Sequence, residues 1–188
     1  MKLDSRLQAL LLSVHLGALA LALAPPIFFG AVVAPAVFRV VPTRDMAAEV
    51  QSQILSRLCL MAQVSFGILF VTAWLLTRDD ASKLTRSLLT RLPVLGFFAA
   101  LVIRQLLIPP IDRIREEAPG LIDTLPAADP SRALLDRYHR LSTGLFSVEI
   151  AAALVLLLVT ARLLTQQRAA PPPPAAARPP VPKVLDLG

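Results

Sequence analysis

The stretch GAVVAPAVFRVV, residues 30–41, decides the fold. Apart from Arg39 it holds only apolar or small residues, and it continues an apolar run that starts at Leu7. A helix of about 20 mostly apolar residues crosses roughly 30 Å of hydrocarbon, so this run can span a membrane. Proline lacks a backbone donor and clashes with the preceding helical turn, so we predict one long transmembrane helix that is bent or interrupted at Pro35 and at the Pro25–Pro26 pair.

The backbone carbonyls that these prolines free must find partners inside the bilayer. We therefore expect the bend to lie against the second and fourth spans, where small residues such as Gly30 and Ala34 permit close approach. The start of the run also resembles a secretory signal peptide. Its apolar part exceeds the usual core of about 7 to 15 residues and continues to Val41, so we expect it to be retained.

Three further apolar segments follow the first. The four predicted spans cover residues 7–41, 54–77, 88–108 and 141–164. Hydrophobic residues make up 55% of the 188 residues, and the mean hydropathy is +0.65; both values are too high for an ordinary soluble domain. The sequence thus predicts an all-α integral membrane four-helix bundle over residues 1–166, with each helix antiparallel to its neighbours.

The connections differ in composition. Pro42 and Thr43 form a predicted helix cap, followed by a polar helical turn that runs into the second span. The longest connection, residues 109–140, ends in a segment that we predict to be an amphipathic helix on the membrane surface. Residues 167–188 are Pro-rich and cannot bury a core, so we expect a disordered tail of extended, polyproline-like character.

The positive charge of the chain points to lipid. The formal net charge is +6, but aromatic residues are only 5% of the chain, which leaves no stacking platform for nucleic acid. We expect the lipid bilayer as the main partner, with a membrane protein or a second copy of the chain as a further one. An even number of spans puts both termini on one side. Basic residues concentrate between residues 78 and 91, which favours a bacterial inner membrane location with both termini in the cytoplasm.

Polar residues inside the spans are the main candidates for function, because they are costly in lipid. Four of them fall in one half of the bilayer: Arg39, Gln63, Arg104 and Glu149. Two interpretations remain open. The cluster forms either a polar cavity in which Glu149 binds a proton or a cation, or a structural ion pair between Arg104 and Glu149 with an amide beside it.

Metal binding and catalysis have little support. His15, Cys59 and Met61 could supply soft ligands for copper(I), but they lack the repeated spacing of a metal site, so we expect no metal and no cofactor. The sequence contains no nucleophile elbow, phosphate-binding loop, paired-carboxylate site or zinc signature. We therefore expect no enzymatic activity.

Three motifs carry a family resemblance. GAVVAPAVFR ends the first predicted span, PPIDRIR follows the third, and YHRLSTGL introduces the fourth. Together they resemble the transmembrane protein 205-like family, a four-helix membrane domain of unknown function, over about residues 8–164. The positions that carry the resemblance are Ala34, Pro35, Phe38, His139 and Ser142. The resemblance implies a fold and a membrane location but no catalytic residue.

Two functions from different classes follow. The first is a membrane protein of unassigned activity that binds or passes a small solute or ion through a polar half-cavity. The alternative is a non-transporting accessory or scaffold subunit that contacts a partner through its helices or its Pro-rich tail. A transporter needs a hydrated path through both halves of the membrane, whereas the sequence shows a polar cluster in only one half.

Overall fold

The computed structural model describes residues 4–78, 82–118, 124–126 and 129–169. Four helical columns are long and apolar enough to cross a membrane: Ser5–Val40, Arg44–Leu76, Lys83–Glu117 and Pro130–Thr165. This confirms the predicted all-α membrane bundle. The Pro-rich tail was predicted for residues 167–188; residues 167–169 instead belong to the last turn of α6, and the rest lies outside the described residues.

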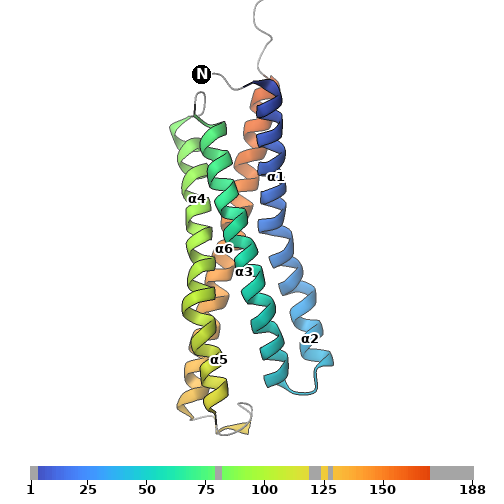
Figure 1. The fold of residues 1–188 in the computed structure, drawn as a ribbon, viewed down its shortest axis with the longest axis vertical. Coiled ribbons are helices and arrows are strands. Elements are labelled where there is room, and N and C mark those ends of the chain that lie inside the picture. The colour runs from blue at the N-terminus through green and yellow to red at the C-terminus, as the bar shows by residue number, and fades with distance from the viewer. Residues whose placement is uncertain (1–3, 79–81, 119–123, 127–128, 170–188) are drawn as a thin grey trace, which may run out of the picture.

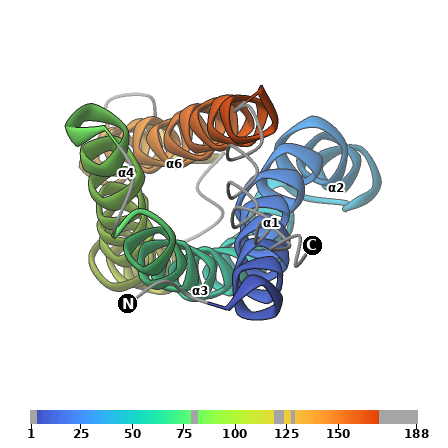
Figure 2. The same cartoon turned by 90° about the horizontal axis from the view of Figure 1, so that it is seen from above.

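Each column is one long helix or a helix with a short π-helical turn inside it. The elements are α1 (Ser5–Phe28), the π turn η1 (Phe29–Val33), α2 (Ala34–Val40), α3 (Arg44–Leu76), α4 (Lys83–Val102), the π turn η2 (Ile103–Leu107), α5 (Ile108–Glu117) and α6 (Pro130–Ala169). Figure 2 shows the columns at the corners of a square, with α1 and α4 each between α3 and α6. α1 begins and α6 ends at the same end of the bundle (Figure 1).

Both π turns end two residues before a proline, which explains their position. Pro35 follows η1, and Pro109 and Pro110 follow η2. Because a proline ring clashes with the carbonyl four residues earlier, the chain upstream widens to hydrogen bonds that span five residues. The Ala34 N–H accordingly donates to the Phe29 carbonyl oxygen. The predicted break at Pro35 thus takes the form of a π turn, whereas α1 continues as α-helix through the Pro25–Pro26 pair, where a break was also expected.

The second and fourth columns are continuous helices. Thr43 caps α3, since its Oγ1 accepts a hydrogen bond from the Met46 N–H at 3.2 Å, and the polar turn after it runs into the span as predicted. The surface helix predicted before the fourth span is not a separate element. It forms the first turns of α6, because the segment from Ser131 to Leu141 consists mostly of good helix formers and contains no proline or glycine that could end a helix.

Small and large residues alternate in the core between the columns. The largest fully buried apolar side chains include Leu19, Phe66, Leu69, Ile103 and Leu156. Alanines pack among them, so the columns approach closely. The tightest contact is at Gly96 of α4, where an added Cβ would overlap the ring of Phe66 on α3.

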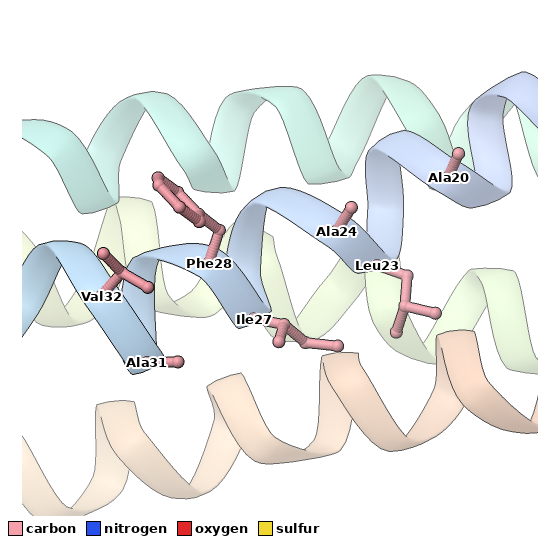
Figure 3. Close-up of a pocket in the computed structure, with 7 residues that line it drawn as sticks. All are labelled: Ala20, Leu23, Ala24, Ile27, Phe28, Ala31 and Val32. Carbon is pink, nitrogen blue, oxygen red and sulfur yellow. The ribbon is translucent and has the colours of Figure 1, made fainter.

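The outer face of the first column carries a shallow apolar hollow (Figure 3). Seven residues of α1 and η1 line it: Ala20, Leu23, Ala24, Ile27, Phe28, Ala31 and Val32. No residue of another column lines this hollow in the described part of the chain. It therefore belongs to the surface that faces away from the core of the bundle.

Candidate functional site

All four columns line a pocket of about 350 Å³ at the end of the bundle where α2 and α5 lie, opposite the start of α1 (Figure 1). This volume falls within the range of small-molecule sites. The first column contributes Phe29, Gly30, Ala34 and Phe38; α3 contributes Ala48, Gln51, Ser52 and Leu55; α5 contributes Ile108, Ile111 and Arg115; and α6 contributes His139, Ser142, Thr143 and Phe146.

The π turns place the wall of this pocket. Phe29 and Gly30 belong to η1, and Ile108 directly follows η2. Small residues on facing columns, such as Gly30 and Ala48, leave the space that larger side chains would fill. π turns inside α-helices often occur at functional sites, and here two of them border one pocket.

The inner wall of the pocket is aromatic. Phe29 of η1 and Phe146 of α6 pack edge to face, with ring centroids 6.3 Å apart and an interplanar angle of 78°. Such pairs are favourable because the positive edge of one ring meets the negative face of the other. Leu55 and Ile108 extend this apolar surface, so the deep part of the pocket suits an apolar group.

Hydrogen bonds between elements fix the polar side chains of the pocket. Gln51 Nε2 on α3 donates to the carbonyl of Ala34 at 3.1 Å, next to the proline that follows η1. Ser52 Oγ donates to Asp112 Oδ1 on α5 at 2.8 Å. These two bonds tie α3 to the first and third columns beside the π turns.

Arg115 is a polar pocket residue with unused hydrogen-bonding capacity. Its Nη1 is buried without a hydrogen-bond partner, and the nearest carboxylate oxygen, Oδ1 of Asp112, is 3.9 Å away. Asp45 and Glu49 also act on it electrostatically. The guanidinium therefore offers a donor to a ligand, while three carboxylates offset its charge.

Four of the five residues that carry the family resemblance line this pocket. They are Ala34, Phe38, His139 and Ser142; the fifth, Pro35, is exposed next to Ala34. These positions lie far apart in the sequence, and the fold brings them together between α2 and α6. The motif thus marks the pocket.

A second polar group lies in the half of the bundle near the termini. His15 of α1 is buried between α3 and α6, with Nδ1 2.8 Å from Thr72 Oγ1 and Nε2 3.3 Å from Thr160 Oγ1. Thr72 Oγ1 donates its proton to the Ile68 carbonyl at 2.8 Å, so it accepts from His15 Nδ1–H, and Nε2 accepts from Thr160. We assign the neutral Nδ1–H tautomer from this network. Both ring nitrogens are therefore used without a metal.

His15 also sets the relative height of α3 and α6, because it contacts Thr72 and Thr160 together. A helix rises about 1.5 Å per residue, so along α3 Gln63 lies about 14 Å and Cys59 about 20 Å from Thr72. Along α6, Glu149 lies about 16 Å from Thr160, at a height between those of Gln63 and Cys59. This distance separates Cys59 from His15, so the copper ligand set considered from the sequence does not assemble.

Three of the four predicted cluster residues share this middle level. The charges of Arg104 and Glu149 both act on the Cys59 thiol, and Gln63 lies one helical turn from Cys59. Arg39 does not join them, because it is exposed at the outer end of α2. The cluster is therefore smaller than the sequence predicted.

The ion pair expected between Arg104 and Glu149 is absent from the described residues. Oε1 of Glu149 is buried without a hydrogen-bond partner, and Arg104 is only half-buried. The inward face of the third column takes Ile103 and Leu107 instead. Arg104 stands at the edge of that face, from which a long side chain can reach toward the membrane surface.

Sequence reasoning missed most polar residues of the pocket. Gln51, Ser52, Asp112 and Arg115 lie beyond or at the ends of the apolar segments, where charged residues are common. A weak signal was present in their spacing: Asp112 and Arg115 are three residues apart and share a helix face.

One family comparison matches this chain. A family model described as a domain of unknown function, DUF4149, matches residues 10–119, which is more than half of the chain and runs from α1 to just past the end of α5. No curated protein and no solved structure matches.

Proposed function

Since this chain belongs to the DUF4149 family, whose description gives no activity, we propose a function from its geometry: it is an integral membrane protein that binds a small solute in the pocket between its four columns. The pocket of about 350 Å³ is the observation that carries this proposal. Small-molecule sites combine an apolar lining with a few polar groups that orient the ligand.

The lining indicates the kind of solute. The edge-to-face pair of Phe29 and Phe146 suits an aromatic or compact apolar body. Arg115 Nη1 is a buried donor without a partner, so a carbonyl or hydroxyl oxygen of the solute would satisfy it. Because Asp45, Glu49 and Asp112 offset the charge of Arg115, the acceptor need not be an anion.

Binding has more support than passage. Between the pocket and the other end of the bundle, the core holds fully buried side chains such as Phe66, Leu69 and Leu156. The polar group nearest the other end, around His15, has its ring nitrogens bonded to threonines. These features favour a pocket open at one end, and the proposal includes no enzymatic step.

The proposal also includes the family relation and the orientation in the membrane. The agreement between the motif and the pocket supports kinship with the transmembrane protein 205-like family. Four basic residues follow α3 or lie in the first part of α4, at the same end of the bundle as the start of α1: Arg78, Lys83, Arg86 and Arg91. This supports a bacterial inner membrane protein with that end in the cytoplasm.

A thermal-shift measurement on the detergent-purified protein tests solute binding. The probes are benzamide, acetophenone and benzyl alcohol, which join an aromatic body to one oxygen acceptor. At least one should raise the midpoint of unfolding in a saturable manner. Ala48→Leu, which fills the pocket, should abolish the shift, and Ala20→Leu on the outer face of α1 should keep it.

No shift with any probe, or equal shifts in the two leucine variants, would reject the proposal. Flux of the bound probe across proteoliposomes then separates binding from passage. We expect no flux above that of protein-free vesicles, and flux that Ala48→Leu removes would replace binding by transport.

The hollow on the outer face of α1 favours a second candidate, an accessory subunit that packs against another membrane helix. Its small residues Ala20, Ala24 and Ala31 would permit close approach of a second backbone. A Cys59→Ser, Ala24→Cys variant should then form disulfide-linked dimers in membranes, whereas Cys59→Ser, Ala48→Cys should not. Equal cross-linking of the two variants would count against this candidate.

A further inference from the structure

A carboxyl group without a counter-charge lies deep inside the bundle. Glu149 is 1% exposed, and its Oε1 has no hydrogen-bond partner. No basic side chain in the described ranges forms an ion pair with it. An isolated carboxylate in such an interior is costly, so the group is held there as the neutral acid.

Glu149 lies directly behind the inner wall of the pocket. Ser142, Phe146 and Glu149 are spaced four and three residues apart, so they share one face of α6. Ser142 and Phe146 line the pocket, whereas Glu149 does not, and it lies about 4.5 Å further along the helix than Phe146. The carboxyl is thus within one helical turn of the pocket.

Two columns face this carboxyl with groups that can respond to its charge. α3 presents the Cys59 thiol and the Gln63 amide at heights on either side of it, whereas Arg104 of η2 stands at the edge of the inward face of the third column. Gln63 is 8% exposed, and its Nε2 is a buried donor without a partner. A donor that the neutral acid leaves unused is thus available to the carboxylate.

The first column adds no titratable group at this height. Two contacts align α1 with α6: His15 with Thr160, and Phe29 with Phe146. Both contacts fit one antiparallel register between the two helices. In this register Glu149 stands opposite Pro26, which is buried. The nearest titratable side chain of α1 is His15, near the other end.

We propose that Glu149 is a reversible proton-binding site of this protein and exchanges its proton with the pocket side of the membrane. A proton needs no cavity, in agreement with a carboxyl that lies outside the pocket lining. On exchange, the carboxyl O–H bond breaks and the proton passes to water in the pocket. Gln63 Nε2–H, at a height within about 3 Å of Glu149, is the donor available to the carboxylate. Toward the other end, Ala153 and Leu156 are fully buried and block exchange.

Dicyclohexylcarbodiimide tests this site in the wild-type protein, because it reacts with protonated carboxyl groups in apolar surroundings. The purified protein is incubated with the reagent at a series of pH values, and the modified peptide is identified by mass spectrometry. We expect modification at Glu149, with a rate that falls about tenfold per pH unit above the midpoint, as the binding of one proton requires. Glu149→Gln should abolish modification, and Glu117→Gln, at an exposed position outside the pocket, should not change it.

Access from the pocket is tested with the two leucine variants. Ala48→Leu should slow the modification of Glu149 severalfold, and Ala20→Leu should leave the rate unchanged. Modification without pH dependence, or its absence at Glu149, would overturn the proposal. Suppression by sodium ions at constant pH would overturn it in favour of a metal-ion site, and equal rates in the two variants would overturn exchange through the pocket.

The proton site does not depend on the proposed solute. If no probe shifts the thermal midpoint but Glu149 is still modified by the carbodiimide, solute binding is rejected and the proton site stands. If a probe shifts the thermal midpoint but Glu149 is not modified, the proton site is rejected and solute binding stands.

Discussion

His15 shows what one polar residue contributes to this bundle. Its ring joins α1 to α3 and α6 through the hydroxyls of Thr72 and Thr160. A hydrogen bond between transmembrane helices stabilises the fold by about 1 kcal/mol, because its loss leaves a polar group without a partner in an apolar interior. In a core built mostly from alanine and leucine, such a bond also fixes which faces meet.

The first prediction concerns Thr72. Thr72→Val keeps the shape of the side chain but leaves His15 Nδ1–H without an acceptor, so the free energy of unfolding should fall by about 1 to 2 kcal/mol. Unfolding in mixed detergent micelles measures this. Thr90→Val is the matched control, because Thr90 Oγ1 bonds only to carbonyls of its own helix. Equal stability of the two variants would mean that the His15 bond contributes nothing.

At the residue scale, depth along a span is the property that the sequence can predict. Gln63 and Glu149 stand at one height because their distance from the ends of their spans determines it. The direction of Arg104 could not be read in the same way, since a half-turn difference around the helix separates an ion pair from a side chain that reaches the membrane surface. The partners of His15 lie 57 and 145 residues away in sequence, and no local pattern announces them.

At the scale of elements, Pro35 and the Pro109–Pro110 pair change the helix geometry of the residues that precede them. The sequence located the break at Pro35 correctly but could not give its form, because the choice between a kink and a π turn depends on which neighbours satisfy the loosened carbonyls. Gln51 of α3 bonds to the carbonyl of Ala34, directly before Pro35, and so connects the second column to this turn. The Pro109–Pro110 pair produced a second π turn that the sequence analysis did not anticipate, because those residues were assigned to a loop.

The second prediction tests η1. Pro35→Ala restores the missing N–H and removes the ring, so η1 should revert to α-helix and shift Phe29 and Gly30 in the pocket wall. Thermal shifts with the pocket probes should therefore weaken at least severalfold, while membrane insertion changes little. Pro42→Ala, in the connection after α2, is the control. Wild-type behaviour of Pro35→Ala in both assays would show the break to be incidental.

The third prediction tests the contact between α3 and α4. In Gly96→Ala, the new methyl group overlaps the Phe66 ring, so the free energy of unfolding should fall by about 1 to 3 kcal/mol, as for other overpacked cores. Gly67→Ala, where nothing lies within 4 Å of the added Cβ, should not destabilise. Adding Phe66→Leu to Gly96→Ala should recover part of the loss, and no recovery would place the strain elsewhere.

At the scale of the whole molecule, apolar segment length determined the architecture. Four runs of sufficient length gave the number of columns and put the start of α1 and the end of α6 together. Helix ends were less predictable, because α3, α5 and α6 extend into polar sequence where helix propensity, not hydropathy, decides. The pocket arises only when four columns meet, so its polar residues could not be recognised one segment at a time.

The fourth prediction concerns the Pro-rich end of the chain, which lies outside the described residues. Deletion of everything after Gln167 should leave membrane insertion and the thermal midpoint of the bundle unchanged, since such a composition buries no apolar surface. Gel filtration and thermal unfolding in detergent measure this. A large loss of folded protein would show that the segment packs against the bundle.

The two π turns also give the molecule an adjustable register. Each turn holds one residue more than an α-helical turn would, and conversion to α-helix would rotate the chain beyond it by about 100° and move it by about 1.5 Å. α2 and α5 are the segments beyond the two turns, and both form walls of the pocket. A step of one residue in either turn would thus change which side chains of α2 or α5 face the pocket, while the end of the bundle held by His15 keeps its packing.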